Sequence, residues 1–450
     1  MDPVGVAARA SSRRRIRSAS RGAAVLAGFV AAGILITHLV GTPTPTVQLV
    51  RPTPARSSAL SSSSAASPGA TASPTLKALV PVRKAPSVKH YGLSTSPALS
   101  ANGRFVAFMS YLSANAAASK GYFDLFVYDR QTHALELASA SGDGTPVHGA
   151  FPDISADGRY VAFYAGSGRV LVRDRVQKVL RLASASSTGE RGNAGAVTPS
   201  VSMSDDGRYV AFNSEATNLV PGDTNGFGDI FVHDMSTGVT TRVSISSSGQ
   251  QADHPSDSPA ISGDGRYVTF ASDATNLTGG AVPACTDQLY GCSQIFVHDR
   301  VTGKTTLASA GPGAVVGDGA SRYPTISDDG RLVAFESKAS NLGAAPDADG
   351  GDWDAFVFDR QTGTVTLTSD GVPAASYTKA TVSGSGRLVS FEGGAGDKLY
   401  VHNISTKADR LLGPYDAGAV SFSDDDHLIA YGAGKIVVLT LKTGTKEIVP

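Results

Sequence analysis

Apolar and polar residues alternate in short runs along residues 91–450, and the same pattern returns roughly every 40 to 65 residues. Many of these runs read aromatic-Val-Ala-Phe or a close variant, which is typical of a short β-strand rather than a helix. Turns that contain Gly separate the runs, and Gly adopts positive φ angles without a steric penalty. The pattern predicts an all-β fold built from short antiparallel hairpins.

Seven copies of one unit make up this region, and each opens with a short apolar element ending in Ser, followed by a turn, usually Asp-Gly-Arg, and a strand. These turns and strands lie at Asn102–Phe108, Asp157–Phe163, Asp206–Phe212, Asp264–Phe270, Asp329–Phe335, Ser385–Phe391 and Asp425–Tyr431. A further strand follows in each copy, at Leu125–Tyr128, Val170–Arg173, Ile230–His233, Ile295–His298, Ala355–Phe358, Leu399–His402 and Ile436–Leu439. A second turn, often Asp-x-x-Thr-Gly, and a short closing strand complete the unit.

One four-stranded sheet cannot bury both of its faces, so the copies must cover one another. Stacking them face to face around an axis does this and protects most strand edges, which predicts a seven-bladed β-propeller. The copies at 377–413 and 416–450 are the weakest, so a six-bladed ring is the alternative. The mode of closure stays open, because residues 87–93 could pair with the last copy.

The repeat resembles the TolB-like, WD40-like (PD40) propeller repeats, whose consensus runs Ser-Pro-Asp-Gly-Arg, Ile-Ala-Phe, Asp-Ile-Tyr-Val and Thr-Gly. The resemblance covers residues 91–450 and is most specific at 199–244, 257–309 and 321–369. It implies the propeller fold, but it does not imply a role in the Tol system, because TolB has six blades and an additional α/β domain. The Pro of the consensus is replaced in every copy, by Ala101, Ala156, Asp205, Gly263, Asp328, Gly384 and Asp424.

The first 88 residues have a different character. Residues 1–21 contain six arginines, and residues 22–41 form an uncharged apolar run long enough to span a bilayer as a helix. Residues 42–88 are rich in Pro, Ser, Thr and Ala. We expect a cytoplasmic N-terminus, a transmembrane signal-anchor and a disordered linker, which together place the propeller (89–450) outside the cytoplasmic membrane. A cleaved signal peptide is the alternative to the anchor.

The net charge of the chain changes sign close to the same boundary. Residues 1–90 hold twelve Lys and Arg against one acid, a net charge of +11, and the remainder carries −11. An acidic propeller argues against nucleic acid as a partner, because binding phosphates requires a basic surface.

Two acid-rich runs are candidate Ca²⁺ sites, because carboxylate and amide oxygens around a Gly bend suit this cation. Neither run has the distal Glu of an EF-hand loop, and solvated turns explain them equally. No cofactor is otherwise required. The candidate ligands are Asp223, Asn225, Asp229, Asp347, Asp349, Asp352 and Asp354.

Other residues with reactive side chains have structural interpretations. Cys285 and Cys292 lie seven positions apart, and in an exported domain we expect them to form a local disulfide. His233, His298 and His402 share one repeat position with Phe358, which indicates packing rather than catalysis. Asn218, Asn276 and Asn341 recur in one loop, and each is expected to cap a turn through its side chain.

The sequence contains no G-x-S-x-G, H-E-x-x-H or P-loop motif. We therefore expect a non-catalytic scaffold of the cell envelope that binds a protein, peptide or glycan at its loop-rich face or channel mouth. The alternative is a Ca²⁺-dependent propeller hydrolase or lyase, whose acids and His would converge at the channel.

Overall fold

The computed structural model describes residues 94–110, 123–141, 147–166, 168–196, 200–279, 293–343, 353–369, 380–393, 398–415 and 418–449. The chain divides into two units, 1–74 and 75–450, and all described residues belong to the second. The predicted anchor and linker therefore lie outside the described residues. Among those residues, no helix is long and apolar enough to cross a membrane.

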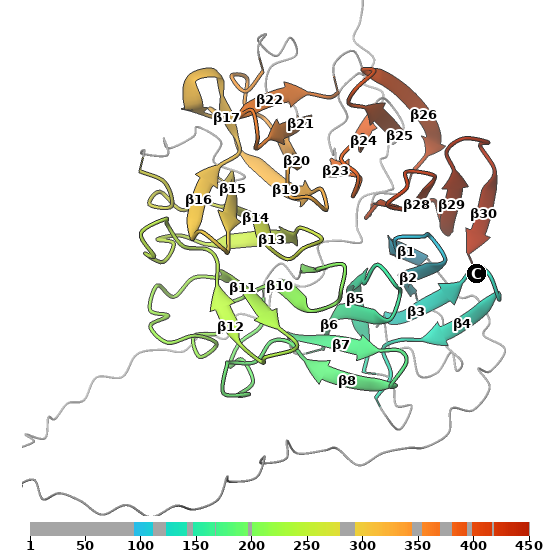
Figure 1. Cartoon of the computed structure of the whole chain (residues 1–450), viewed down its shortest axis with the longest axis horizontal. Helices are drawn as coiled ribbons and strands as arrows, with labels where there is room; N and C mark the ends of the chain where they lie inside the picture. Colours follow the sequence, from blue (N-terminus) through green and yellow to red (C-terminus); the bar gives the residue numbers. More distant parts are fainter. Residues whose placement is uncertain are drawn as a thin grey trace, which may run out of the picture. The chain divides into compact units, whose positions relative to one another are not determined.

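Among the described residues, seven four-stranded antiparallel sheets form the blades of a propeller and are arranged in a ring (Figure 1). We call the axis of this ring the central channel, as in other propellers. Blades 1 and 2 contain β1 (Ser94–Leu99), β2 (Phe105–Ser110), β3 (Asp124–Asp129), β4 (Ala134–Leu137), β5 (Gly149–Ile154), β6 (Tyr160–Ala165), β7 (Arg169–Asp174) and β8 (Val179–Leu182). Blades 3 and 4 contain β9 (Val201–Met203), β10 (Tyr209–Ser214), β11 (Asp229–Asp234), β12 (Thr240–Arg242), β13 (Ser256–Ile261), β14 (Tyr267–Ser272), β15 (Gln294–Asp299) and β16 (Lys304–Leu307).

The remaining blades repeat this arrangement. Blade 5 contains β19 (Ser321–Ile326), β20 (Leu332–Ser337), β21 (Asp354–Asp359) and β22 (Thr364–Leu367). Blades 6 and 7 contain β23 (Thr381–Val382), β24 (Leu388–Gly393), β25 (Lys398–Asn403), β26 (Ala408–Pro414), β27 (Ser421–Phe422), β28 (Leu428–Gly432), β29 (Ile436–Thr440) and β30 (Lys446–Val449). A small hairpin connects blades 4 and 5, formed by β17 (Ala310–Gly311), the 3-10 turn η1 (Pro312–Ala314) and β18 (Val315–Val316).

The sequence prediction of seven blades is confirmed, and the six-bladed alternative is wrong. Each blade takes its four strands in order from one continuous stretch of chain. Residues 87–93 lie outside the described residues, and β27 to β30 supply four strands of the last blade. Within the described part of the chain, blades 7 and 1 therefore meet by packing and share no strand.

The hydrophobic core lies between the blades. The described residues form seven buried clusters, and each joins two neighbouring blades. The cluster that closes the ring joins Val106 and Phe108 of blade 1 with Ala430 and Val438 of blade 7. Because every blade buries both faces in this way, no single blade has a core of its own.

The Asp-Gly-Arg turn between the first two strands of a blade is fixed by its own side chains. In blade 4, Ser262 donates a hydrogen bond to the carboxylate of Asp264 at 2.6 Å, and that carboxylate also accepts the backbone N–H of Arg266. Gly265 has a φ of +72°, which Gly tolerates best. Its Cα lies so close to the ring of Tyr209 in blade 3 that a side chain there would overlap the ring.

The Arg of the same turn ties the second strand to the third. Arg266 forms two hydrogen bonds with Asp299, at 2.9 and 2.7 Å, and also lies over the ring of Tyr267. The guanidinium holds the pKa of Asp299 well below its usual range. The same pair recurs in four other blades, as Arg104–Asp129, Arg159–Asp174, Arg208–Asp234 and Arg331–Asp359.

Candidate functional site

One end of the central channel is formed by the first turn of each blade, where the residue before the Asp-Gly pair faces the neighbouring blades. The backbones at this position are linked in a circle of hydrogen bonds from blade to blade, such as Ala101 N–H to Ala156 O at 3.0 Å. Among the described residues six such bonds join neighbouring blades, at every junction except that of blades 6 and 7, and their donors are Ala101, Ala156, Asp205, Gly263, Asp328 and Asp424. This is the position where the TolB-like consensus has Pro, which has no N–H to donate.

Three of these residues are acids, Asp205 in blade 3, Asp328 in blade 5 and Asp424 in blade 7, and we call this trio the acidic mouth. Partial burial raises the pKa of Asp205 to about 6, and the charge of Asp424 adds to the shift. Burial and the charges of Asp205 and Asp424 raise the pKa of Asp328 to about 7. Carboxylates from three separate blades therefore repel one another across one shared space.

Small residues make room for the acidic mouth. The Cα of Gly263 lies under the carboxylate of Asp205, and the Cα of Gly384 lies under that of Asp328. At both positions a Cβ would overlap a carboxylate oxygen. From blade 3 to blade 7 the acids thus alternate with glycines, and the carboxylates of Asp205 and Asp328 extend over the turn of the next blade.

The wall of the channel is formed by the first strand of each blade, and in four blades this strand contains a β-bulge. Each bulge begins at a non-Gly residue with a φ of 50° to 54° that precedes a Pro, namely Ser96, Phe151, Ser258 and Tyr323. Large side chains rarely adopt this conformation. Phe151 and Tyr323 are 41% and 43% exposed, although they belong to the innermost strands β5 and β19. The free edge of an innermost strand borders the channel, so these aromatic side chains lie at its wall.

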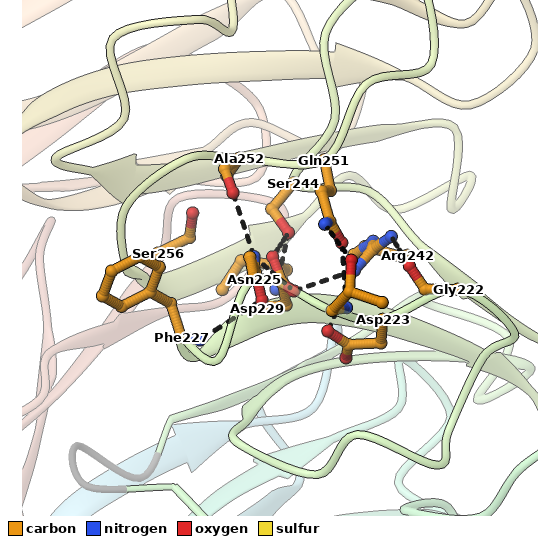
Figure 2. A network of polar contacts seen from close by, with 12 residues as sticks. Gly222, Asp223, Asn225, Phe227, Asp229, Arg242, Ser244, Gln251, Ala252 and Ser256 are labelled. Atoms are coloured by element: carbon orange, nitrogen blue, oxygen red, sulfur yellow. Dashed lines mark hydrogen bonds and ion pairs between the residues drawn. The ribbon is translucent and has the colours of Figure 1, made fainter. Parts of the chain in front are cut away.

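The first predicted metal site holds an arginine. Asp223 and Asp229 lie 3.3 and 3.1 Å from the same nitrogen of Arg242, and their side chains are only 3% and 0% exposed (Figure 2). Asp229 also accepts hydrogen bonds from Ser244 and from the amide of Asn225. The guanidinium supplies the positive charge that a cation would bring, so these residues together do not fit a Ca²⁺ site.

Arg242 explains why these acids are buried in blade 3. It occupies an outer-strand position where blades 4 and 5 have Leu307 and Leu367. Burial and the neighbouring charge of Asp229 raise the pKa of Asp223, while Arg242 opposes that shift.

The second predicted metal site can be followed at one residue only. Asp354 accepts a hydrogen bond from Ser369 at 2.6 Å, as Asp229 does from Ser244. Asp347, Asp349 and Asp352 lie outside the described residues, as do Cys285 and Cys292 with their predicted disulfide. Within the described part of the chain, no group of three or more His, Cys, Asp and Glu side chains is placed to hold a metal ion.

The recurring His and Asn residues have structural roles. His233 and His298 are buried, bond to Thr240 and Thr305 at 2.8 and 2.9 Å, and have pKa values lowered by burial. The Asn side chains reach the connection from the preceding blade rather than their own turn. Their backbone partners are Arg191 and Asn193 for Asn218, Gln251 and Asp253 for Asn276, and Val316 and Asp318 for Asn341.

No protein-family model matches the chain, and no curated protein matches its sequence. Solved structures do match its fold. An oligogalacturonate lyase in complex with manganese aligns with a TM-score of 0.52 and 12% identity, over 81% of this chain and 96% of that one. The chain is a seven-bladed β-propeller.

TolB proteins are also among the propeller's matches. TolB from Acinetobacter baumannii aligns with a TM-score of 0.40 and 14% identity, over 73% of this chain and 76% of that one. Hydrazine synthase from Kuenenia stuttgartiensis aligns with a TM-score of 0.46 and 13% identity, over 82% and 99% of the two chains. At these identities the likeness concerns the fold of the propeller alone.

Proposed function

We propose that this propeller is a binding scaffold, anchored in the cytoplasmic membrane and exposed outside it, which binds a basic peptide segment of a protein partner in its channel. The observation that carries the proposal is the pair of exposed aromatic side chains, Phe151 and Tyr323, held at positive φ on the channel wall. Backbone strain at large residues accompanies ligand sites in many proteins.

The acidic mouth selects the charge of the ligand. Asp205 and Asp328 have raised pKa values because their ionised forms are partly desolvated and repel one another and Asp424. A Lys or Arg side chain would relieve that repulsion, whereas a neutral glycan would not. This charge argument favours a basic peptide over a sugar chain as the ligand.

A titration with a defined probe tests the binding proposal. We expect the peptide Lys-Trp-Lys-Trp-Lys to bind the full-length protein more tightly at pH 8 than at pH 5, because the carboxylates must ionise to attract it. The variant D205N/D328N/D424N should remove this pH dependence, and Phe151→Ala should weaken binding at both pH values. Chitotriose serves as the neutral glycan probe. Binding of chitotriose instead of the peptide, or peptide binding unchanged in both variants, would overturn the proposal.

The membrane location rests on the apolar run at 22–41 and its flanking arginines. We expect the full-length protein to stay in the membrane pellet after alkaline carbonate extraction, and its propeller to be cut by protease added to spheroplasts. A mature N-terminus located after residue 41 would instead support a cleaved signal peptide.

The hydrolase or lyase alternative has a separate test. The lyase among the matched structures shares only the fold with this chain. Release of unsaturated products from oligogalacturonate in the presence of Ca²⁺ or Mn²⁺ would replace a binding function by a catalytic one.

A further inference from the structure

The connections that leave blades 2, 3 and 4 are three versions of one short hairpin. They begin at Ala185, Ile245 and Ala310, and the fifth residue of each has a positive φ. In the first two versions the third residue is a serine. Ser187 bonds the backbone N–H and C=O of Thr240 in the outer strand of blade 3, at 3.0 and 3.4 Å.

Blade 4 repeats this contact. Ser247 bonds the backbone N–H and C=O of Thr305 at 2.9 and 3.2 Å. The hydroxyl of Thr305 also donates to the carbonyl of Ile245 and contacts His298. The connection thus covers the edge of the next blade with a chain of polar contacts.

At the junction of blades 4 and 5, all three polar partners are replaced by apolar residues. Pro312 stands in the place of Ser247, Val365 in the place of Thr305, and Phe358 in the place of His298. None of these side chains can donate a hydrogen bond. The outer strand of blade 5 therefore lacks the serine hydrogen bonds of the two preceding blades, although β17 still lies against β22.

A groove of about 740 Å³ opens at this junction, lined by residues of β16, β22 and the hairpin that contains β17. These three elements are labelled in Figure 1. Its volume is within the usual range for ligand sites. The lining includes five apolar side chains, Val297, Leu307, Leu342, Phe358 and Val365.

The edge of β22 offers backbone groups to this groove. Val365 pairs with Phe358 as Thr305 pairs with His298, so its N–H and C=O point away from β21. In blade 4, the corresponding groups of Thr305 are bonded by Ser247. Pro312 has no side-chain polar group with which to do the same.

We propose that this groove binds an extended peptide segment of a partner protein, which adds a strand to the edge of β22 and inserts an apolar side chain between blades 4 and 5. The hydrogen-bonding part of the proposal follows from the two preceding junctions, where a serine hydroxyl of the connecting hairpin bonds the same edge groups. Lys304 and Arg360 line the groove, while Asp299 is neutralised by Arg266, so the segment carries an acidic residue beside the apolar one. This site is separate from the channel and does not depend on the proposed function.

The test uses a fluorescein-labelled peptide, Glu-Val-Leu-Val-Glu-Thr, and the full-length protein in detergent. Fluorescence anisotropy should show saturable binding to the unmodified chain. The variant P312S/F358H/V365T restores the polar contacts of blade 4 and should weaken binding at least about tenfold. Equal binding to that variant, or none to the unmodified chain at millimolar concentration, would contradict the proposal.

If the triple variant folds poorly, a second variant that reverses the charge of one groove residue still tests the proposal. Lys304 is exposed, so Lys304→Glu leaves the packing intact. This variant should bind the acidic peptide about threefold more weakly, and should bind Lys-Val-Leu-Val-Lys-Thr more tightly than the unmodified chain does. If the unmodified chain and the Lys304→Glu variant both prefer the same one of the two peptides, this groove is excluded as the binding site.

Discussion

Asp424 in blade 7 donates its backbone N–H to the carbonyl oxygen of Ala101 in blade 1 at 2.9 Å. These residues are far apart in sequence, and this bond belongs to the circle that joins the first turns of the blades. Ser421 adds a second bond across the same junction, accepting the N–H of Leu99 at 2.9 Å. The ring is therefore closed by backbone contacts at the channel and by a hydrophobic cluster further out.

Because Gly265 contacts the ring of Tyr209, adding a methyl group at residue 265 should lower the stability of the fold. Gly265→Ala should destabilise the protein by about 1–3 kcal/mol more than Gly303→Ala. Both glycines have a φ near +70°, but a Cβ added at Gly303 would meet no other atom within 4 Å. The difference therefore isolates the clash with the ring from the backbone strain. Equal costs in chemical denaturation would show that the blades do not touch at this point.

The pairs of Arg and Asp within the blades predict acid sensitivity. The pKa of Asp299 is lowered by Arg266, so the pair stabilises the fold above about pH 4 and the stability is lost as the pH falls further. Asp299→Asn should cost about 1 kcal/mol at pH 7 and much less near pH 2, measured by urea unfolding.

Blade 6 lacks this Arg–Asp pair, so the missing acid can be introduced there. It has Asn403 where blades 1 to 5 have the acid, and Arg387 instead lies 3.3 Å from Asp426. Asn403→Asp should stabilise the protein by up to about 1 kcal/mol at pH 7 and not at pH 2. A stabilisation that does not vary with pH would contradict the ion-pair explanation.

The repeat alignment predicted the blades well because each blade uses the same residues for the same contacts. The alternation of apolar residues gave the strands, and the Asp-Gly-Arg turns gave their order. The acidic mouth was missed, although Asp205, Asp328 and Asp424 occupy one repeat position. The reason is physical: their proximity depends on ring closure, and no local pattern reports that residues of blades 3, 5 and 7 meet.

At Asp223 the sequence did predict a site, but it did not reveal the residue that decides the chemistry there. Its spacing matches that of a cation-binding loop, but the partner that decides its chemistry is Arg242, on a different strand. Arg242 lies in an outer strand, at a position that is apolar in the neighbouring blades. Only the pairing of strands brings the arginine to the carboxylates.

Replacing Arg242 should cause a large loss of stability, and replacing its two acidic partners as well should restore most of it. Arg242→Leu leaves the carboxylates of Asp223 and Asp229 buried without their counter-charge, which should cost about 3–5 kcal/mol. Blade 4 has Leu307 and Gln294 at the positions of Arg242 and Asp229. The variant R242L/D223N/D229Q should therefore recover most of the loss in thermal unfolding. Full stability of the single variant would refute the role of Arg242.

The acidic mouth should make stability depend on pH in the opposite direction to the Arg266–Asp299 pair. The pKa of Asp328 is raised to about 7 in the folded protein, so its contribution is full below about pH 4 and is lost as the pH rises through 7. Asp328→Asn should raise the melting temperature at pH 8 and leave it unchanged near pH 4. Asp299→Asn is a control with the opposite pH dependence, because Arg266 lowers the pKa of Asp299. A lower melting temperature for Asp328→Asn at pH 8 would show that the ionised carboxylate stabilises the fold.

The central claim is that the closed ring brings acids of three separate blades into one mouth. Its most direct test is the pKa of Asp328, measured by NMR from the ¹³C shift of its carboxyl group. We expect a pKa near 7, and a clearly lower value in the variant D205N/D424N, whose substitutions lie in other blades. A pKa of about 4 in the unmodified protein, or one that does not respond to D205N/D424N, would contradict it.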